Sequence, residues 1–199
     1  MSKFVIKDKV IHEINVEKSR FIAYITPLEK EADFQTFKQS VKQLEKGARH
    51  YPFAYQVDQN AKSSDDGEPS GTAGRPLLEL INNHQLCNIA IIVVRYFGGV
   101  KLGAGRLLRT YVDAANAALL RADKYRVIPS YVYAMCVKGA DAARIEYLLV
   151  KNECEIVARQ YVTDEVNLTV NAPQDLDLTA LLNSEVTRQE ESNLYRKEE

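Results

Sequence analysis

The chain has 199 residues, enough for one large domain or two small ones. Hydrophobic residues at 46% and charged residues at 27% are normal for a globular protein. The longest apolar run, residues 89–94, is far too short to span a bilayer. The 3 cysteines are widely spaced and form no CxxC pair, which argues against a zinc site or a disulfide framework and fits a reducing compartment. The N-terminal sequence MSKFVIKDKV lacks the continuous apolar stretch of a signal peptide, so we expect a cytoplasmic protein.

Charge is distributed unevenly along the chain, although the net charge is only −1. Residues 1–131 carry 19 basic and 14 acidic residues, whereas residues 132–199 carry 7 basic and 13 acidic ones. This asymmetry indicates two units with different surfaces, of which the first is better suited to a polyanion. The basic excess permits contact with nucleic acid without requiring it.

Strands rich in β-branched and aromatic residues alternate with helices in the first part of the chain. The segment 87–96 is dominated by Ile and Val and is expected to be a central strand that is buried on both faces. Residues 103–122 give the strongest helical pattern, with small alanines on the face that approaches the sheet. The predicted elements are a hairpin of strands over 4–16 and 20–26, a helix over 31–46, a strand over 53–58, a helix over 75–83, a strand over 87–96 and a helix over 103–122.

A second pattern follows the Ile-Pro-Ser segment at residues 128–130, where we place a domain boundary. Its order is β-α-β-β-α-β, which is the split βαβ, ferredoxin-like arrangement. The predicted elements are a strand over 131–138, a helix over 140–151, strands over 155–163 and 166–171, a short helix over 176–183 and a closing strand over 188–197.

The loop over residues 63–74 (SSDDGEPSGTAG) carries the three carboxylates Asp65, Asp66 and Glu68. Long ordered loops are often functional, yet Ser, Asp, Gly and Pro are also the ordinary turn formers. These carboxylates therefore either order the loop, bind a cation such as Mg²⁺, or meet basic residues of a partner. Because the spacing matches no recognised metal loop, we assign no metal ligand or catalytic residue and expect no cofactor, with Mg²⁺ left open.

A second loop, residues 98–105 (GGVKLGAG), ends the strand over 87–96 and opens the longest helix. Glycines let backbone amides approach a ligand closely, and a helix N-terminus adds unpaired N–H groups and a positive dipole. The loop is neither a Walker motif nor a GxGxxG fingerprint, and a tight turn with solvated cations is the alternative. We predict a seat for phosphate or an RNA backbone, formed by Arg95, Gly98, Gly99, Lys101, Gly103, Arg106 and Arg109.

For three residues near these loops the sequence leaves two possible roles open. His50 is expected either to be structural or to contact a partner, since no GxSxG elbow or spacing links it to a serine nucleophile. Tyr96 and Phe97 either stack on nucleic-acid bases or pack against the core.

The string SSDDGEPSGTAGRP, followed by VVRYFGGVKLGAGRLLRTY, closely resembles the YigZ/Impact family. The segments SRFIA and HYPFAY are also similar to that family's first domain. The resemblance implies an α+β fold of two domains. The first, over residues 1–128, would be a ribosomal-protein-like two-layer α/β sandwich, similar to the fourth domain of elongation factor G. The second, over residues 131–199, would be a ferredoxin-like domain similar to that factor's fifth domain.

The resemblance also implies a role in translation, because eukaryotic relatives of the family act as translation regulators. Fold analogy alone does not establish function, but the basic first half independently favours an RNA-linked role. We predict a non-enzymatic binding protein that contacts RNA or a ribosome-associated protein through the loop over 98–105. The alternative is a metal-dependent hydrolase that uses Asp65, Asp66 and Glu68. The sequence indicates no membrane partner and leaves the oligomeric state open.

Overall fold

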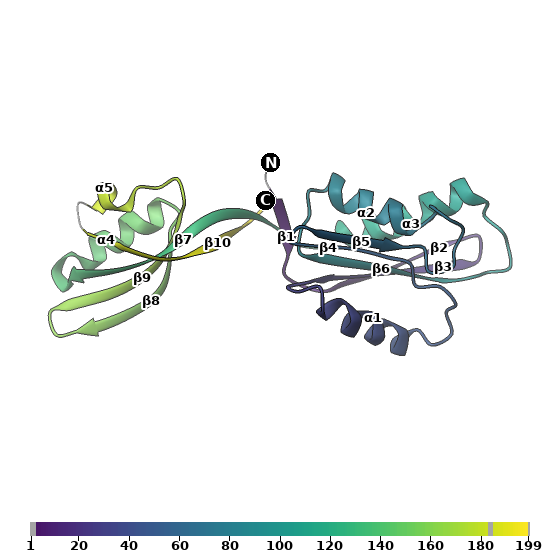
Figure 1. Cartoon of the computed structure of the whole chain (residues 1–199), viewed down its shortest axis with the longest axis horizontal. Helices are drawn as coiled ribbons and strands as arrows, with labels where there is room; N and C mark the ends of the chain where they lie inside the picture. Colours follow the sequence, from purple (N-terminus) through teal and green to yellow (C-terminus); the bar gives the residue numbers. More distant parts are fainter. Residues whose placement is uncertain (1–2, 183–184, 199) are drawn as a thin grey trace. The chain divides into compact units, whose positions relative to one another are not determined.

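The computed structural model describes residues 3–182 and 185–198. The chain divides into two compact units: the first ends at Arg126 and also takes in the last residues from Lys197, and the second is Val127–Arg196. Both units mix helices with strands (Figure 1), which confirms the predicted α+β class. None of the helices in the described residues is long and apolar enough to cross a membrane.

The first unit is built on a five-stranded sheet in which every neighbouring pair of strands is antiparallel. Its strands, in order across the sheet, are β2 (Val10–Val16), β3 (Ser19–Pro27), β6 (Ile89–Tyr96), β4 (Phe53–Val57) and β5 (Asn60–Ser64). The predicted opening strand over 4–16 is wrong in one respect, since β1 (Lys3–Ile6) is a separate strand that ends before β2 begins. β5 was not predicted, because its sequence NAKSS has no apolar alternation.

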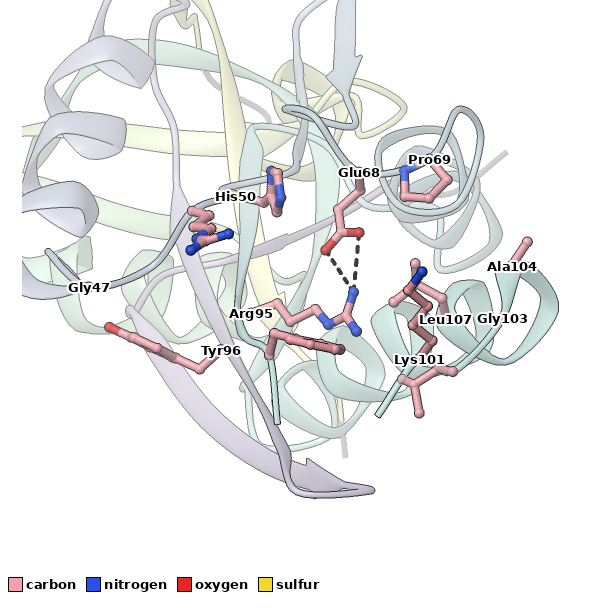
Figure 2. A pocket seen from close by; sticks show the side chains of 13 residues that line it. Gly47, His50, Glu68, Pro69, Arg95, Tyr96, Lys101, Gly103, Ala104 and Leu107 are labelled. Carbon is pink, nitrogen blue, oxygen red and sulfur yellow. Dashed lines mark hydrogen bonds and ion pairs between the residues drawn. The ribbon is translucent and has the colours of Figure 1, made fainter. Parts of the chain in front are cut away.

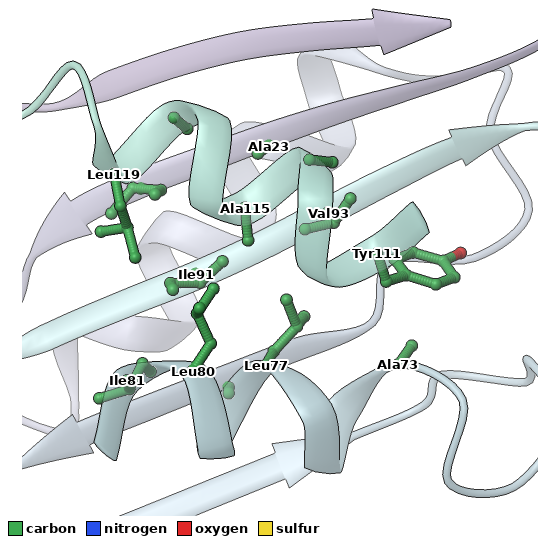
Figure 3. Packing of buried hydrophobic residues seen from close by; sticks show 14 of the residues in the cluster. Ala23, Ala73, Leu77, Leu80, Ile81, Ile91, Val93, Tyr111, Ala115 and Leu119 are labelled. Atoms are coloured by element: carbon green, nitrogen blue, oxygen red, sulfur yellow. The ribbon is translucent and has the colours of Figure 1, made fainter. Parts of the chain in front are cut away.

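Helices cover both faces of this sheet (Figure 1). α2 (Gly74–Asn83) and α3 (Ala104–Leu119) pack on one face, where Leu77, Leu80 and Ala115 point toward Ile91 of β6 (Figure 3). α1 (Asp33–Leu44) packs on the other face through Phe34 and Val41. The prediction of a two-layer sandwich is therefore wrong, because the unit has three layers. The physical reason is that successive residues of β3 and β6 are apolar and buried, so both faces of the sheet need cover.

The second unit has the predicted order β-α-β-β-α-β. β9 lies between β7 and β8, and β10 pairs with the other edge of β7, which is the split βαβ arrangement. Both helices contribute to one apolar cluster on one face of this sheet. The elements are β7 (Lys124–Lys138), α4 (Gly139–Lys151), β8 (Glu155–Val162), β9 (Glu165–Pro173), α5 (Leu178–Leu182) and β10 (Thr187–Lys197). β7 begins before the predicted residue 131, and the predicted end of the short helix at residue 183 lies outside the described residues.

The third layer can be tested through Phe34, which is 2% exposed and lies 4.6 Å from Phe53 and 4.7 Å from Tyr55 between ring centroids. Replacing Phe34 with alanine is expected to lower the free energy of unfolding by about 3–5 kcal/mol, because it leaves a cavity between α1 and the sheet. The matched control is Leu44→Ala on the same helix, where a side chain that is 69% exposed should matter little. Urea denaturation followed by circular dichroism measures both, and equal effects of the two substitutions would contradict the packing of α1 described above.

Candidate functional site

A cavity of about 660 Å³ lies in the first unit, between the end of β6 and the start of α3. Side chains from four separate segments line it, among them Arg49, His50, Glu68, Phe97 and Lys101. The isolated antiparallel bridge between His50 and Arg95 brings the segment before β4 alongside the end of β6. The two loops singled out in the sequence, 63–74 and 98–105, thus both contribute to one concave surface (Figure 2).

A buried ion pair forms one wall of this cavity. The Arg95 guanidinium donates through Nη1 to Glu68 Oε1 at 3.1 Å and to Oε2 at 3.2 Å, as drawn in Figure 2. The two side chains are only 11% and 4% exposed, respectively. The Tyr111 hydroxyl of α3 donates a further hydrogen bond to Glu68 Oε1 at 2.7 Å. Burial, followed by the negative charge of Glu68, raises the pKa of Tyr111, so this phenol stays a hydrogen-bond donor.

This pair changes what two predicted site residues can do. Arg95, predicted as a phosphate contact, already has an internal carboxylate partner. Glu68, predicted to order its loop or to meet a partner, has a buried carboxylate that binds Arg95 and Tyr111. Of its two predicted roles, the geometry supports ordering of the loop.

Asp65 also turns inward and binds its own loop. Its Oδ1 accepts the backbone N–H groups of Ala73 at 2.9 Å and Gly74 at 2.8 Å, and its Oδ2 accepts that of Gly71 at 2.9 Å. These acceptors satisfy N–H groups at the start of α2, where the residue at the N-cap, Ala73, has no side chain that could do so. Burial raises the pKa of the Asp65 carboxyl, but the three N–H donors outweigh that effect and leave its pKa lowered.

Asp66 joins the loop to the neighbouring segments. Its Oδ2 accepts the backbone N–H of Tyr51 at 2.9 Å, and its Oδ1 pairs with Lys38 Nζ at 3.1 Å. Burial again raises the pKa of this carboxyl, while the Tyr51 N–H and Lys38 together leave it lowered. His50 Nδ1 lies 2.9 Å from the backbone oxygen of Asp66, so His50 also has a partner within the chain.

The three carboxylates of loop 63–74 therefore face three different sets of donors. Within the described residues, no group of three His, Cys, Asp or Glu side chains is placed to hold a metal ion. Asp65, Asp66 and Glu68 consequently do not form the shared oxygen cluster that the predicted hydrolase alternative needs.

The glycines of loop 98–105 are required for two different reasons, which are close packing at Gly98 and a positive φ at Gly99 and Gly103. Gly98 is required by close packing, since a Cβ there would lie 2.1 Å from the backbone carbon of Lys18. Its N–H donates to Ser19 Oγ at 3.1 Å, so this predicted ligand amide already has an acceptor. Gly99 and Gly103 have φ angles of +91° and +76°, a left-handed conformation that L side chains rarely adopt. Only these two of the three predicted amides remain candidates for a ligand.

The predicted cations are not all brought together. Lys101 lines the cavity, but Arg106 and Arg109 do not. Arg106 Nη1 lies 2.9 Å from Glu17 Oε1, and Arg109 Nε donates to the backbone oxygen of Gly105 at 3.3 Å. Arg49, which the sequence analysis missed, takes their place in the lining. Its only sequence signal was its position next to His50.

Of the three Lys and Arg side chains that line the cavity, Arg95 is paired with Glu68, whereas Lys101 and Arg49 have no internal counter-charge among the described residues. Within the part of the chain that the structure describes, neither has a hydrogen-bond or ion-pair partner. α3 begins beside them with no side-chain cap and no acidic residue in its first turn. The first bond of this helix runs from the Leu107 N–H to the Gly103 oxygen at 2.9 Å, so the N–H groups of residues 104–106 have no acceptor within the helix. The cavity rim thus combines two cations with the positive end of a helix dipole.

The two aromatic residues at the end of β6 behave differently. The Tyr96 hydroxyl donates to Glu45 Oε2 at 2.7 Å, and its ring packs against the core beneath α1. Both residues line the cavity, but the Phe97 side chain is 58% exposed and is not part of an apolar core cluster of the described residues. Of the two alternatives, packing against the core therefore describes Tyr96 and not Phe97.

Comparison with known proteins identifies the family. The Impact N-terminal domain matches residues 17–119, more than half of the chain. The chain belongs to the IMPACT family. It is 43% identical to the IMPACT family member YvyE of Bacillus subtilis over 121 residues, which is 59% of this chain and 56% of that protein. It is also 33% identical to the IMPACT family member YigZ of Escherichia coli over 157 residues, 76% of each chain.

A solved structure supports the likeness over both units. The crystal structure of a hypothetical protein is similar with a TM-score of 0.63 and 29% sequence identity. This match covers 95% of the present chain and 98% of the other. The predicted likeness of the two domains to parts of elongation factor G stays a prediction.

The role of Asp65 can be tested through its pH dependence. Asp65→Ala is expected to lower the free energy of unfolding by roughly 2 kcal/mol at neutral pH, because α2 loses charged acceptors. Since the folded-state pKa is lowered, this contribution is complete above the unfolded-state pKa of about 3.9 and is lost as the pH falls through the folded value. Urea denaturation at neutral and acidic pH should therefore show a difference between wild type and variant that shrinks with acid.

Asp113→Ala is the matched control, since Asp113 is an exposed carboxylate on α3. It should change the free energy of unfolding by less than about 0.5 kcal/mol at either pH. If the difference in free energy of unfolding between wild type and Asp65→Ala stays constant down to strongly acidic pH, the charge of the Asp65 carboxylate is not what stabilises α2.

Proposed function

We propose that this chain is a non-enzymatic, translation-associated protein that binds RNA, and that the cavity beside α3 holds the RNA phosphates. The observation that carries the proposal is the group at the rim: Lys101 and Arg49 without internal partners, next to an uncapped helix N-terminus. Anions are stabilised by such N–H groups and by nearby ammonium and guanidinium groups.

The charge balance favours a polyanion as the partner of this rim. The loop carboxylates that would repel a phosphate are each bound to donors inside the unit. Residues 1–131 carry 19 basic against 14 acidic residues, so the longer-range field of this part also attracts anions.

The translation part of the proposal comes from the family. The family resemblance implies a role in translation, because eukaryotic relatives of the family act as translation regulators. RNA is the polyanion that a protein with such a role would meet. Membership of the family supports this role, and the cavity supplies a chemical reason for it. The second unit, in which residues 132–199 carry 7 basic and 13 acidic residues, has the wrong charge balance for the RNA contact.

A salt titration tests the proposal. Lys101→Gln combined with Arg49→Gln should weaken binding of a labelled single-stranded RNA. It should also reduce the slope of log affinity against log salt by about 0.7 for each lost phosphate contact, because fewer counterions are released. Fluorescence anisotropy at several KCl concentrations measures both quantities.

The matched control is Lys62→Gln, which removes an exposed lysine of β5 that does not line the cavity. It should leave the slope unchanged. An unchanged affinity and slope in the double variant, or no binding of RNA by the wild type, would overturn the proposed function.

A further inference from the structure

We infer that the cavity takes an unpaired nucleotide, whose base stacks on Phe97 while its phosphate lies at Lys101 and the start of α3. This inference rests on the proposed function and narrows it, because it specifies single-stranded RNA and adds a contact to the base. It also gives a role to an aromatic side chain that is 58% exposed.

Phe97 has the surroundings of a binding platform. Its side chain is 58% exposed although it directly follows the buried strand β6, whereas the neighbouring Tyr96 is anchored to Glu45. The guanidinium carbon of Arg95 lies 5.4 Å from the centroid of the Phe97 ring. Because Glu68 fixes that guanidinium, the ring is supported by a cation that is itself held in place. An exposed aromatic ring in this setting is available for stacking with a planar group.

The two chemical requirements of a nucleotide are met in the same cavity. Phe97 and Lys101 are separated only by the turn that contains Gly98 and Gly99, and both line the cavity. Leu102 adds apolar surface to the lining. A planar base and a phosphate on one ligand would use the aromatic and cationic parts of this lining together.

The cavity suits a single nucleotide better than a duplex. Its volume of about 660 Å³ is typical of sites for small ligands. In a duplex the bases stack on one another and only their edges reach the grooves, so no base face is available to Phe97. Unpaired bases can be splayed out and stacked on an aromatic side chain.

Phe97→Ala separates this inference from the proposed function when two probes are compared. The first probe is a single-stranded oligoadenylate, and the second is inorganic polyphosphate, which has the charge but no bases. Phe97→Ala is expected to weaken oligoadenylate binding roughly 5- to 140-fold and to leave polyphosphate binding unchanged. Lys101→Gln is expected to weaken binding of both probes. Retained polyphosphate binding also shows that the Phe97→Ala variant is folded.

Two further variants and two further ligands test whether the effect is specific to the Phe97 ring and to single-stranded RNA. Phe97→Leu keeps an apolar side chain but removes the ring, so it should also lose oligoadenylate affinity. Tyr161→Ala, which removes a 73% exposed aromatic residue from the second unit, should have no effect. Wild type should bind the single strand more tightly than the corresponding duplex and more tightly than adenosine monophosphate.

The outcomes distinguish the two proposals. If Lys101→Gln weakens oligoadenylate binding and Phe97→Ala does not, stacking on Phe97 is wrong while the phosphate contact stands. Equal affinity for single strand and duplex also overturns the inference, and equal affinity for adenosine monophosphate and the strand overturns the assignment to RNA. If neither probe binds the wild type, the proposed function fails and this inference fails with it.

Discussion

The buried ion pair between Glu68 and Arg95 is the interaction on which the candidate site depends. It joins loop 63–74 to β6, and the Tyr111 hydroxyl extends the connection to α3. Removing one partner of a buried ion pair leaves the other charge uncompensated and costs about 3–5 kcal/mol. Because Arg95 lies two residues before Phe97, the pair also fixes the end of β6 from which loop 98–105 departs. The cavity exists because these segments are held together.

A second consequence of the inward-facing carboxylates is electrostatic. Asp65 binds backbone amides, Asp66 binds Tyr51 and Lys38, and Glu68 binds Arg95. None of these negative charges is left to compensate Lys101 or Arg49 at the rim. A protein with a net charge of only −1 thereby presents a locally cationic site. The arrangement of charges decides what this surface binds, and the total charge does not.

The sequence predicted the regular elements well and the site only in part. The run of Ile and Val in β6 correctly indicated a strand buried on both faces, although the implied two-layer fold overlooked that its second face needs a helix. The sequence motifs located both loops, because such dense clusters of glycines and carboxylates can be recognised in the sequence alone. The sequence does not show which residues pair across the fold. Glu68 and Arg95, for example, are 27 positions apart. Arg49 reaches the cavity because the bridge between His50 and Arg95 brings its segment alongside the end of β6. The same limit applies to Phe97, whose exposure depends on which turn follows β6.

The central claim is that loop 98–105 and the start of α3 bind phosphate groups of RNA. Amide NMR spectra of the full chain, recorded during titration with inorganic phosphate and then with a single-stranded RNA, test it most directly. Both ligands are expected to shift the amide signals of residues 99–104, and RNA is expected to shift those around Phe97 as well. Signals of Val127–Arg196 should stay in place. Shifts confined to that second unit, or spectra that neither ligand changes, would show that loop 98–105 and the start of α3 do not bind phosphate.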